Sequence, residues 1–298
     1  MGNAKRIRFI LNPKSGIIHP VQYIKKAIEY YFPKNLCSFD FNITMAKNHA
    51  YELACEAVEK QYDIVVAIGG DGTVNEAASG LVNSDTSLGI IPLGSGNGFA
   101  RGLGIPLMIR RAARMITVGQ DRPIDVGQIG NRYFFVIAGL GFDAIVGKKF
   151  EDGKIRGPAP YYLAGLTEFF RYRAPKYIIK FDNQVIRTNA LVVAIANIKQ
   201  YGNNAIIAPN AKPDDGLFDL AIIQQTNLVE TVYYLPTLFT GNIDKTPYTK
   251  IFRATHFEIL REYPAPYTLD GEVHEGDKRV IVTMLPKALK VIVSDVNF

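Results

Sequence analysis

The sequence predicts two domains of different class: an N-terminal α/β domain with a parallel sheet and a C-terminal antiparallel β-sandwich. Residues 6–120 alternate strand-like and helical patterns, as βαβ units do. From about residue 125 the pattern changes to short strand-like segments joined by polar turns. Glycine-rich turns follow three N-terminal strands, at the sheet edge where α/β proteins bind ligands. A chain of 298 residues is long enough for two such domains.

Hydrophobic spacing predicts the N-terminal elements. Val21, Ile24 and Ile28 recur at helical spacing, whereas Phe39 and Phe41 alternate with polar residues as in a strand. The predicted elements are a strand at Arg6–Leu11, a helix at Val21–Tyr31, a strand at Ser38–Thr44, a helix at His49–Gln61, a strand at Ile64–Ile68, a helix at Val74–Val82, a strand at Leu88–Pro92 and a helix near Leu107–Thr117.

The C-terminal half contains two helical patterns, at Ala159–Tyr172 and Asn227–Phe239. We place the domains at residues 1–124 and 125–298, with the tail 288–298 able to pack back on the first domain. The predicted C-terminal strands are Arg132–Ala138, Lys176–Asp182, Val185–Ala196, Leu217–Ile223, Thr255–Leu260, Tyr267–Leu269, Val280–Met284 and Leu289–Val293.

The three glycine-type turns are Asn12–Gly16, Gly69–Thr73 and Leu93–Asn97. Glycine lets backbone N–H groups approach a ligand, and a following helix adds the positive end of its dipole, so such turns favour phosphate. Asp71 would repel a phosphate unless Mg²⁺ or a proton lies between them. The alternative is a tight strand–helix turn in which Asp71 is an N-cap residue.

Other ligand-binding motifs match less well. Residues 141–149 depart from the spacing of a P-loop, and Ser95 lacks the flanking glycines of a nucleophile elbow. Gly139–Ala144 matches the Rossmann fingerprint, but no βαβ unit and no acidic residue about 20 positions later follow it. We interpret this segment as a structural or substrate-site turn, with a dehydrogenase as the alternative.

Composition narrows the classes of partner. The net charge of +6 and the pI of about 9.1 suit an anionic partner such as a nucleotide or an acidic membrane surface. Runs of like charge are missing, so a nucleic-acid partner is not expected. The N-terminus lacks the apolar stretch of a signal peptide and the longest apolar runs are far shorter than a membrane span, so we expect a soluble, cytoplasmic protein.

Several motifs together resemble one family. Gly69–Glu76 reads GGDGTVNE and residues 92–97 read PLGSGN. This pair resembles the diacylglycerol kinase catalytic domain family, which includes bacterial lipid kinases, sphingosine kinases and ceramide kinases. The resemblance spans nearly the whole chain, because it continues in the family's order through Ile124–Gly127, Gly139–Ala144, Pro213–Gly216 and Asp270–Glu272.

The resemblance implies a phosphofructokinase-like nucleotide-binding domain and transfer of the γ-phosphoryl group of ATP to a lipid hydroxyl, in a cleft between the domains. It implies that Asp71 and Asp125 hold the catalytic Mg²⁺, directly or through water, and that Glu272 is the general base. The alternative for Glu272 is an exposed position after a type I′ hairpin turn at Asp270-Gly271. The residues implied for the nucleotide are Asn12, Pro13, Lys14, Ser15, Gly16, Thr44, Gly69, Gly70, Asp71, Gly72, Thr73, Val74, Asn75 and Ser95. Those implied for a structural Mg²⁺, found in some bacterial members, are Lys212, Asp215 and Leu217.

Two alternatives stay open, an NAD kinase, because NAD kinases also carry GGDG, and a non-catalytic nucleotide- or lipid-binding protein. Many bacterial diacylglycerol kinases have Asn-Asp where this chain has Asn97-Gly98, which puts diacylglycerol itself in question as the substrate. The aromatic and basic residues of Ala159–Arg173 suit peripheral contact with a membrane, and a core helix with a basic end is the alternative. The oligomeric state is open, a homodimer included.

Overall fold

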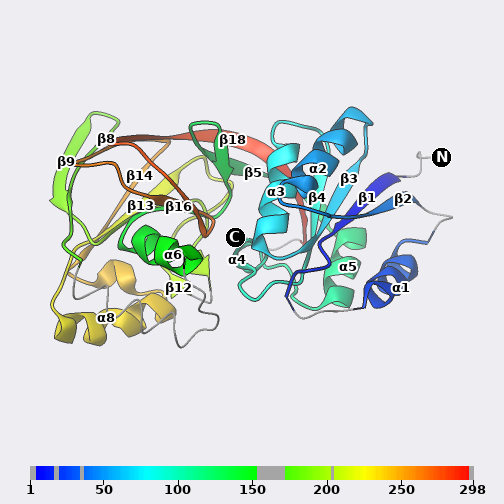
Figure 1. Ribbon diagram of the computed structural model, residues 1–298, viewed down its shortest axis with the longest axis horizontal. Helices are drawn as coiled ribbons and strands as arrows, with labels where there is room; N and C mark the ends of the chain where they lie inside the picture. Colours follow the sequence, from blue (N-terminus) through cyan, green and yellow to red (C-terminus); the bar gives the residue numbers. More distant parts are fainter. Residues whose placement is uncertain (1–4, 17–19, 34–36, 153–171, 203–204, 295–298) are drawn as a thin grey trace. The chain divides into compact units, whose positions relative to one another are not determined.

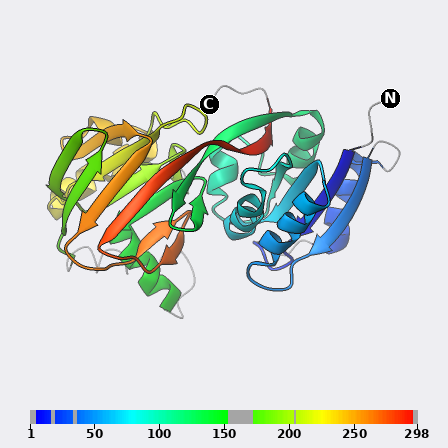
Figure 2. The same cartoon turned by 90° about the horizontal axis from the view of Figure 1, so that it is seen from above.

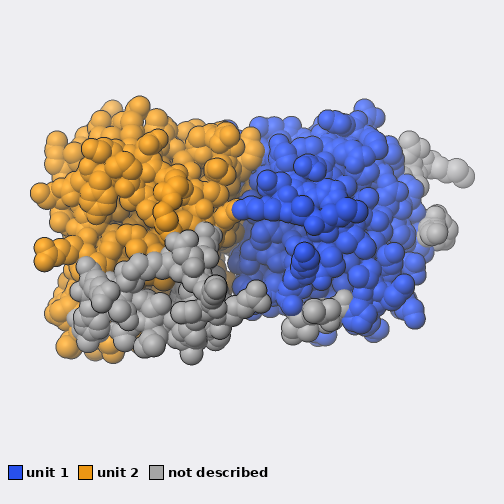
Figure 3. Space-filling model, in the orientation of Figure 1, with its two compact units in different colours: residues 1–126, 285–298 blue, residues 127–284 orange. Residues whose placement is uncertain are grey.

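The computed structural model describes residues 5–16, 20–33, 37–152, 172–202 and 205–294 (Figure 1). The chain forms two compact units, residues 1–126 with 285–298 (unit 1) and residues 127–284 (unit 2; Figure 3). The unit boundaries fall within two long strands, β5 (Gln120–Ile129) and β18 (Arg279–Val293).

Unit 1 contains the predicted parallel sheet. β1 pairs in parallel with β2 and β3, and β3 pairs in parallel with β4. All of β3 and β4 is buried, as expected for strands covered on both faces. In spatial order the strands are β2 (Cys37–Ile43), β1 (Lys5–Leu11), β3 (Ile64–Gly69), β4 (Ser87–Pro92) and the C-terminal part of β18.

Helices cover both faces of this sheet (Figure 1 and Figure 2). α2 packs beside α3, and α1 packs beside α5. The predicted apolar stripes face inward; Ile24 and Ile28 of α1, for example, are buried. The helices are α1 (Val21–Tyr31), α2 (His49–Glu59), α3 (Asp71–Leu81), α4 (Gly98–Gly102) and α5 (Ile109–Val118).

Unit 2 is the predicted antiparallel sandwich. In spatial order, one sheet contains β14 (Thr249–Ala254), β13 (Phe218–Ile223), β10 (Val192–Ala196), β7 (Ile137–Gly141), β16 (Tyr267–Leu269) and β17 (Glu272–His274). The other contains the N-terminal part of β18, β15 (His256–Arg261), β8 (Lys176–Phe181) and β9 (Gln184–Asn189). Side chains of both sheets form one core, in which Phe218 and Phe257 are fully buried. The fold class is therefore confirmed.

Short elements complete unit 2. β6 (Arg132–Phe134) pairs with the end of β5, and β11 (Gln200–Gly202) pairs with β12 (Ala205–Ile206). Among the described residues of unit 2, the helices are α6 (Phe142–Asp152) and α8 (Leu228–Thr240), the latter followed by the short 3-10 helix η1 (Ile243–Lys245). Of the predicted helix at Ala159–Tyr172, all but Tyr172 lies outside the described residues. Among the described helices, none has both the length and the apolar character needed to cross a bilayer.

Long-range pairing overrides several local predictions. The segments Val280–Met284 and Leu289–Val293 are one strand, β18, although Pro286 and the positive φ of Lys287 interrupt its pattern. Conversely, the expected single strand Val185–Ala196 is two strands, because the chain turns at Ala190-Leu191 to pair β9 with β8 and β10 with β7. Residues 132–138 likewise divide between β6 and β7. The predicted domain boundary at residues 124/125 lies inside β5, two residues before the boundary between the two units.

Candidate functional site

The three predicted turns converge at one edge of the sheet in unit 1. They follow β1, β3 and β4, which are adjacent and parallel. The Asn12 side chain links the first two turns, because its Nδ2 donates to Thr73 Oγ1 at 2.9 Å while its Oδ1 accepts from the Lys14 N–H at 3.0 Å. Residues far apart in sequence are thus held at one site.

Several glycines in these turns are required for packing between the turns. A Cβ at Gly16, whose φ is +61°, would lie 1.6 Å from the Leu93 carbonyl oxygen. A Cβ at Gly94 would lie 2.7 Å from the Cα of Gly70. The backbones of the three turns therefore touch, and a larger residue at Gly16 or Gly94 would push them apart. For these positions, tight packing accounts for glycine without any ligand.

Gly72 differs from these glycines. It is exposed in the first turn of α3, and a Cβ there would meet no described atom within 4 Å other than those of its chain neighbours and of its own helix backbone. Glycine inside a helix costs about 1 kcal/mol relative to alanine, so packing gives no reason for it here. The free space lies at the N-terminus of an 11-residue helix, where backbone N–H groups and the helix dipole favour an anion. Gly72 is the position in this turn that best fits the close approach of a phosphate.

Asp71 is the first residue of α3, and its carboxylate does not cap that helix. The N-cap residue is Gly70, without a side-chain hydrogen bond. Asp71 Oδ2 instead accepts from the backbone N–H of Asn97 at 2.8 Å. Asn97 in turn donates from Nδ2 to the Gly94 carbonyl at 2.7 Å. The carboxylate therefore joins the second turn to the third, which rules out the N-cap alternative.

Other predicted nucleotide residues lie around this edge. Thr44 follows β2 and donates its N–H to the Leu11 carbonyl at the end of β1. Ser95 is exposed at the tip of the third turn. Glu76, one residue beyond Asn75, has a structural role, since its carboxylate accepts from the N–H groups of Asn48 and Ala50 at the start of α2.

A cavity of about 710 Å³ opens beside the third turn. Gly16 and Ser95 line it, together with Arg101 and Arg110, two cations that the sequence reasoning missed. Arg101 also donates from Nε to the Gly96 carbonyl, which braces the turn. Both arginines lie on helices that follow the turn. Their position after the turn was the only indication in the sequence that they belong to the site. Their charge suits an anionic ligand at this edge.

Asp125 lies in the interior of β5 and is 1% exposed. Its Oδ1 accepts from the backbone N–H of Lys287 at 2.8 Å and so helps to hold β18 at its irregular point. This carboxylate has a structural role in unit 1, whatever else it binds.

Unit 2 presents Glu272 on a hairpin. Leu269 pairs with Glu272 across the turn Asp270-Gly271, and both turn residues have positive φ, as in a type I′ turn. The Asp270 carboxylate accepts from the N–H groups of Phe135, Val136 and Ile137 at 2.8–2.9 Å. Glu272 itself is exposed. This geometry is that of the alternative given for Glu272, an exposed position after a type I′ turn, so its role as a base stays a prediction. The sequence reasoning missed Asp270 as the residue that anchors the turn.

The predicted structural metal residues lie on a turn before β13. Asp215 Oδ1 accepts from the Leu217 N–H at 3.2 Å, and its Oδ2 is paired with the Arg253 guanidinium. Arg253 also lies 3.4 Å from buried Asp219, where burial raises the pKa of the carboxyl group despite this cation. A metal ion at Asp215 would have to share this carboxylate with Arg253.

The Rossmann-like segment is structural. Its strand, β7, pairs antiparallel with both β10 and β16, so it belongs to no βαβ unit. Gly141 has φ +119°, and a Cβ there would lie 2.5 Å from the Leu191 carbonyl oxygen. The dehydrogenase alternative therefore has no structural support.

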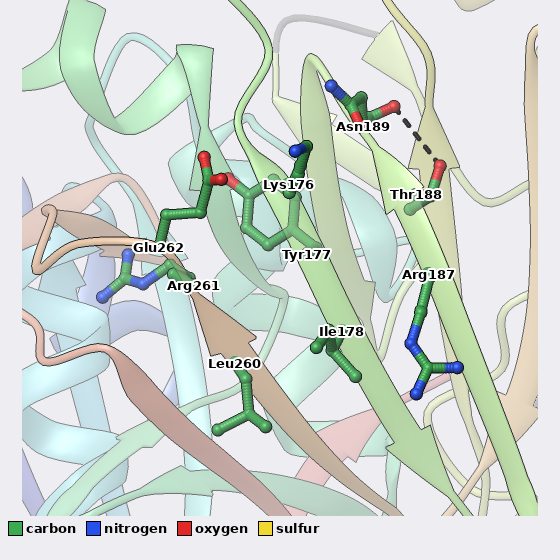
Figure 4. A pocket seen from close by; sticks show the side chains of 9 residues that line it. All are labelled: Lys176, Tyr177, Ile178, Arg187, Thr188, Asn189, Leu260, Arg261 and Glu262. Atoms are coloured by element: carbon green, nitrogen blue, oxygen red, sulfur yellow. Dashed lines mark hydrogen bonds between the residues drawn. The ribbon is translucent and has the colours of Figure 1, made fainter.

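A second pocket lies on the sheet of unit 2 that contains β8, β9 and β15 (Figure 4). Its volume is about 510 Å³, and Lys176 and Arg187 are among its lining residues. Arg261, also at this pocket, is buried and donates to the carbonyls of Pro266 and Asp277. It thereby holds the ends of the segment that carries Asp270 and Glu272. The pocket contains none of the predicted site residues.

Comparison with known proteins agrees with these motifs. Residues 6–129 match the model of the diacylglycerol kinase catalytic domain, and residues 136–293 match that of the YegS C-terminal NAD kinase beta sandwich-like domain. A diacylglycerol kinase of Bacillus subtilis is 30% identical, over 90% of both chains. A Klebsiella pneumoniae protein named "Probable lipid kinase YegS-like" is 32% identical, over 83% of this chain and 84% of its own.

Solved structures share the fold. A crystal structure of a diacylglycerol kinase from Bacillus anthracis superimposes with a TM-score of 0.78 over 99% of both chains, at 22% identity. At that identity the likeness speaks for the fold alone.

Proposed function

Because the chain belongs to the diacylglycerol kinase family and is a lipid kinase, we propose that it transfers the γ-phosphoryl group of ATP to a hydroxyl group of a diacylglycerol, a sphingoid base or a related lipid. The observation that carries this proposal is the convergence of three glycine turns at one edge of the unit 1 sheet. Phosphoryl transfer depends mainly on positioning and on neutralising charge, which such turns supply.

In this proposal the phosphates of ATP bind over the N-terminus of α3. Gly72 leaves room for them. The exposed side chains of Lys14 and Ser95 lie on the first and the third turn. We propose that the other residues of the nucleotide set predicted from the sequence also contact ATP.

Oxygen ligands such as Asp71 fit Mg²⁺, which usually binds through one or two carboxylates together with substrate phosphates. Asp71 uses Oδ2 to accept from Asn97, and this bond orients the carboxylate at the turn. We assign the metal to Asp71 and, through water, to buried Asp125. Mg²⁺ bound there with ATP would neutralise charge on the phosphate oxygens.

Glu272 is proposed as the general base. Its carboxylate accepts the proton of the lipid hydroxyl while the hydroxyl oxygen forms a bond to the γ-phosphorus. The bond from that phosphorus to the β,γ-bridging oxygen breaks, and ADP leaves. Asp270 is a positioning residue in this scheme, because it anchors the turn that presents Glu272.

Replacing Gly72 with alanine separates ligand binding from folding. We expect G72A to fold with unchanged or slightly higher stability, by up to about 1 kcal/mol, because alanine favours the helix and the added Cβ meets no described atom. We expect the KM for ATP to rise about tenfold, because the Cβ occupies the space assigned to a phosphate. Thermal melting and steady-state kinetics measure both effects.

G94A is the matched control for this variant. Its Cβ would lie 2.7 Å from the Cα of Gly70, so it should lower the melting temperature clearly. G72A should not lower it, and an unchanged KM for ATP in folded G72A would argue against a phosphate at this turn.

Replacing Asp270 with asparagine tests its positioning role. Asparagine keeps one acceptor oxygen where aspartate uses two, so the turn should lose part of its anchor to Phe135, Val136 and Ile137. The lost acceptor costs about 1–3 kcal/mol of stability. We expect kcat to fall about tenfold with no change in the KM for ATP. A fall in kcat together with an equal rise in the KM for ATP would assign Asp270 a general structural role.

The substrate is tested with purified protein, radiolabelled ATP and a panel containing diacylglycerol, sphingosine, ceramide and NAD, with separation of products by thin-layer chromatography. We expect a labelled lipid. Labelled NAD without a labelled lipid would favour the NAD kinase alternative, and ATP binding without any product would favour a non-catalytic protein. Gly98, buried at the start of α4, is why the panel extends beyond diacylglycerol.

A further inference from the structure

The helix α8 presents an apolar face to solvent. Val229, Val232 and Tyr233 are 79%, 62% and 73% exposed, and Leu235 and Phe239 are also exposed. With Pro236, these residues follow the i, i+3, i+4, i+7 spacing of a single helical face. In soluble helices this stripe normally faces the core, and a contiguous exposed one marks an interaction surface. We call Val229, Val232, Tyr233, Leu235, Pro236 and Phe239 the α8 face.

The opposite side of α8 is firmly attached to unit 2. Asn227 and Glu230 form a capping box at its start, and the Glu230 carboxylate also accepts from the Tyr248 hydroxyl at 2.5 Å. Tyr234 packs edge-on against Tyr248, with ring centroids 5.6 Å apart. The helix lies at the periphery of the unit (Figure 1). These contacts fix which side of the helix points outward, so the exposure of the α8 face is a property of the fold.

The chemistry around the α8 face suits a lipid bilayer. Glu230 is the only acidic residue of the helix, and it is turned inward to Tyr248. Exposed Lys245 lies on η1, beside Asp244, and η1 contacts both α8 and β14; exposed Lys250 lies on β14. Apolar side chains with an aromatic residue and flanking cations are the composition by which helices rest on anionic membranes. The net charge of +6 adds to this attraction.

We propose that the α8 face docks this kinase on the surface of an anionic lipid bilayer, with its apolar side chains inserted among the headgroups. The proposal rests on the lipid substrate proposed above, because an enzyme that phosphorylates a membrane lipid must reach the bilayer. It places the membrane contact on the α8 face, whereas the sequence suggested the segment 159–173.

The test is co-sedimentation with vesicles of equal parts phosphatidylglycerol and phosphatidylcholine, without ATP. The double variant V232S/Y233S removes apolar surface without adding charge. We expect its partition onto vesicles to fall about tenfold or more, since the variant no longer buries two apolar side chains among the headgroups. Wild-type protein should bind vesicles of phosphatidylcholine alone much more weakly.

The matched control is Y30S/V118S, which changes the same residue types on α1 and α5, where they are 78% and 71% exposed. It should bind vesicles as the wild type does. Equal vesicle binding by all three proteins would overturn the proposal. A change from dimer to monomer in V232S/Y233S during sedimentation velocity, with vesicle binding unchanged, would also overturn it, in favour of a second copy of the chain.

Activity on a short-chain lipid dissolved as monomers separates docking from catalysis. V232S/Y233S should retain wild-type turnover on this lipid and lose turnover on vesicles, because the α8 face serves only to reach the membrane. Loss of both activities in a folded variant would contradict docking as its role. A wild-type protein that binds vesicles but phosphorylates no lipid would contradict the proposed function and leave the docking surface standing.

Discussion

Glu272→Gln should abolish lipid phosphorylation while leaving ATP binding intact. Glutamine has nearly the same size and cannot accept a proton, so the variant tests the base and little else. Loss of a general base lowers kcat by about 10²- to 10⁴-fold. Because Glu272 is exposed after the turn, the melting temperature should not change. Single-turnover assays with radiolabelled ATP, together with equilibrium ATP binding, measure the two effects separately.

Glu275→Gln provides the control for this variant. Glu275 lies three residues later, is exposed, and forms an ion pair with Lys148. Its replacement changes the same charge in the same segment and should leave kcat within about twofold of wild type, since surface ion pairs contribute little. Near-normal activity in Glu272→Gln would remove this residue from the mechanism.

Asp71→Asn should lower kcat by about a hundredfold or more and raise the Mg²⁺ concentration needed for half-maximal activity. Asparagine can still accept from the Asn97 N–H, so the link between the second and third turns is preserved. The negative charge assigned to the metal is lost, and a metal ion contributes several kcal/mol to transition-state stabilisation in such reactions. Titration of activity with Mg²⁺ at saturating ATP provides the measurement.

Asp85→Asn is the matched control for Asp71→Asn. Asp85 is fully exposed in unit 1 and pairs only at the surface with Lys290. Its replacement should leave the Mg²⁺ titration unchanged. If Asp71→Asn titrated like Asp85→Asn, then Asp71 would serve only to join the turns.

Local sequence patterns were sufficient for β1 to β4, for α1, α2, α3 and α5, and for the glycine turns, whereas the short helix α4 was not predicted. Strands and helices that alternate at short range carry their own periodicity, and adjacent parallel strands bring the following turns to one edge. The hairpin at Asp270-Gly271 was likewise readable, because its two residues suit the positive φ that the turn requires.

Other features depended on partners distant in sequence. No local pattern indicates that Gly16 and Gly94 pack against Leu93 and Gly70 while Gly72 faces open space. The same is true of Asp270, whose three amide donors lie 133 to 135 residues earlier in the sequence.

The sequence alone therefore determined the class of each domain and the residues of its turns, because those depend on hydrophobic period and backbone preference within a few residues. The tertiary structure decided which glycines pack and which face open space, where Asp125 is buried, and which side of α8 faces solvent. Each of these depends on atoms that only folding brings together. For the helix Leu228–Thr240, apolar on both sides, the contacts of Glu230 and Tyr234 with Tyr248 select the side that turns inward.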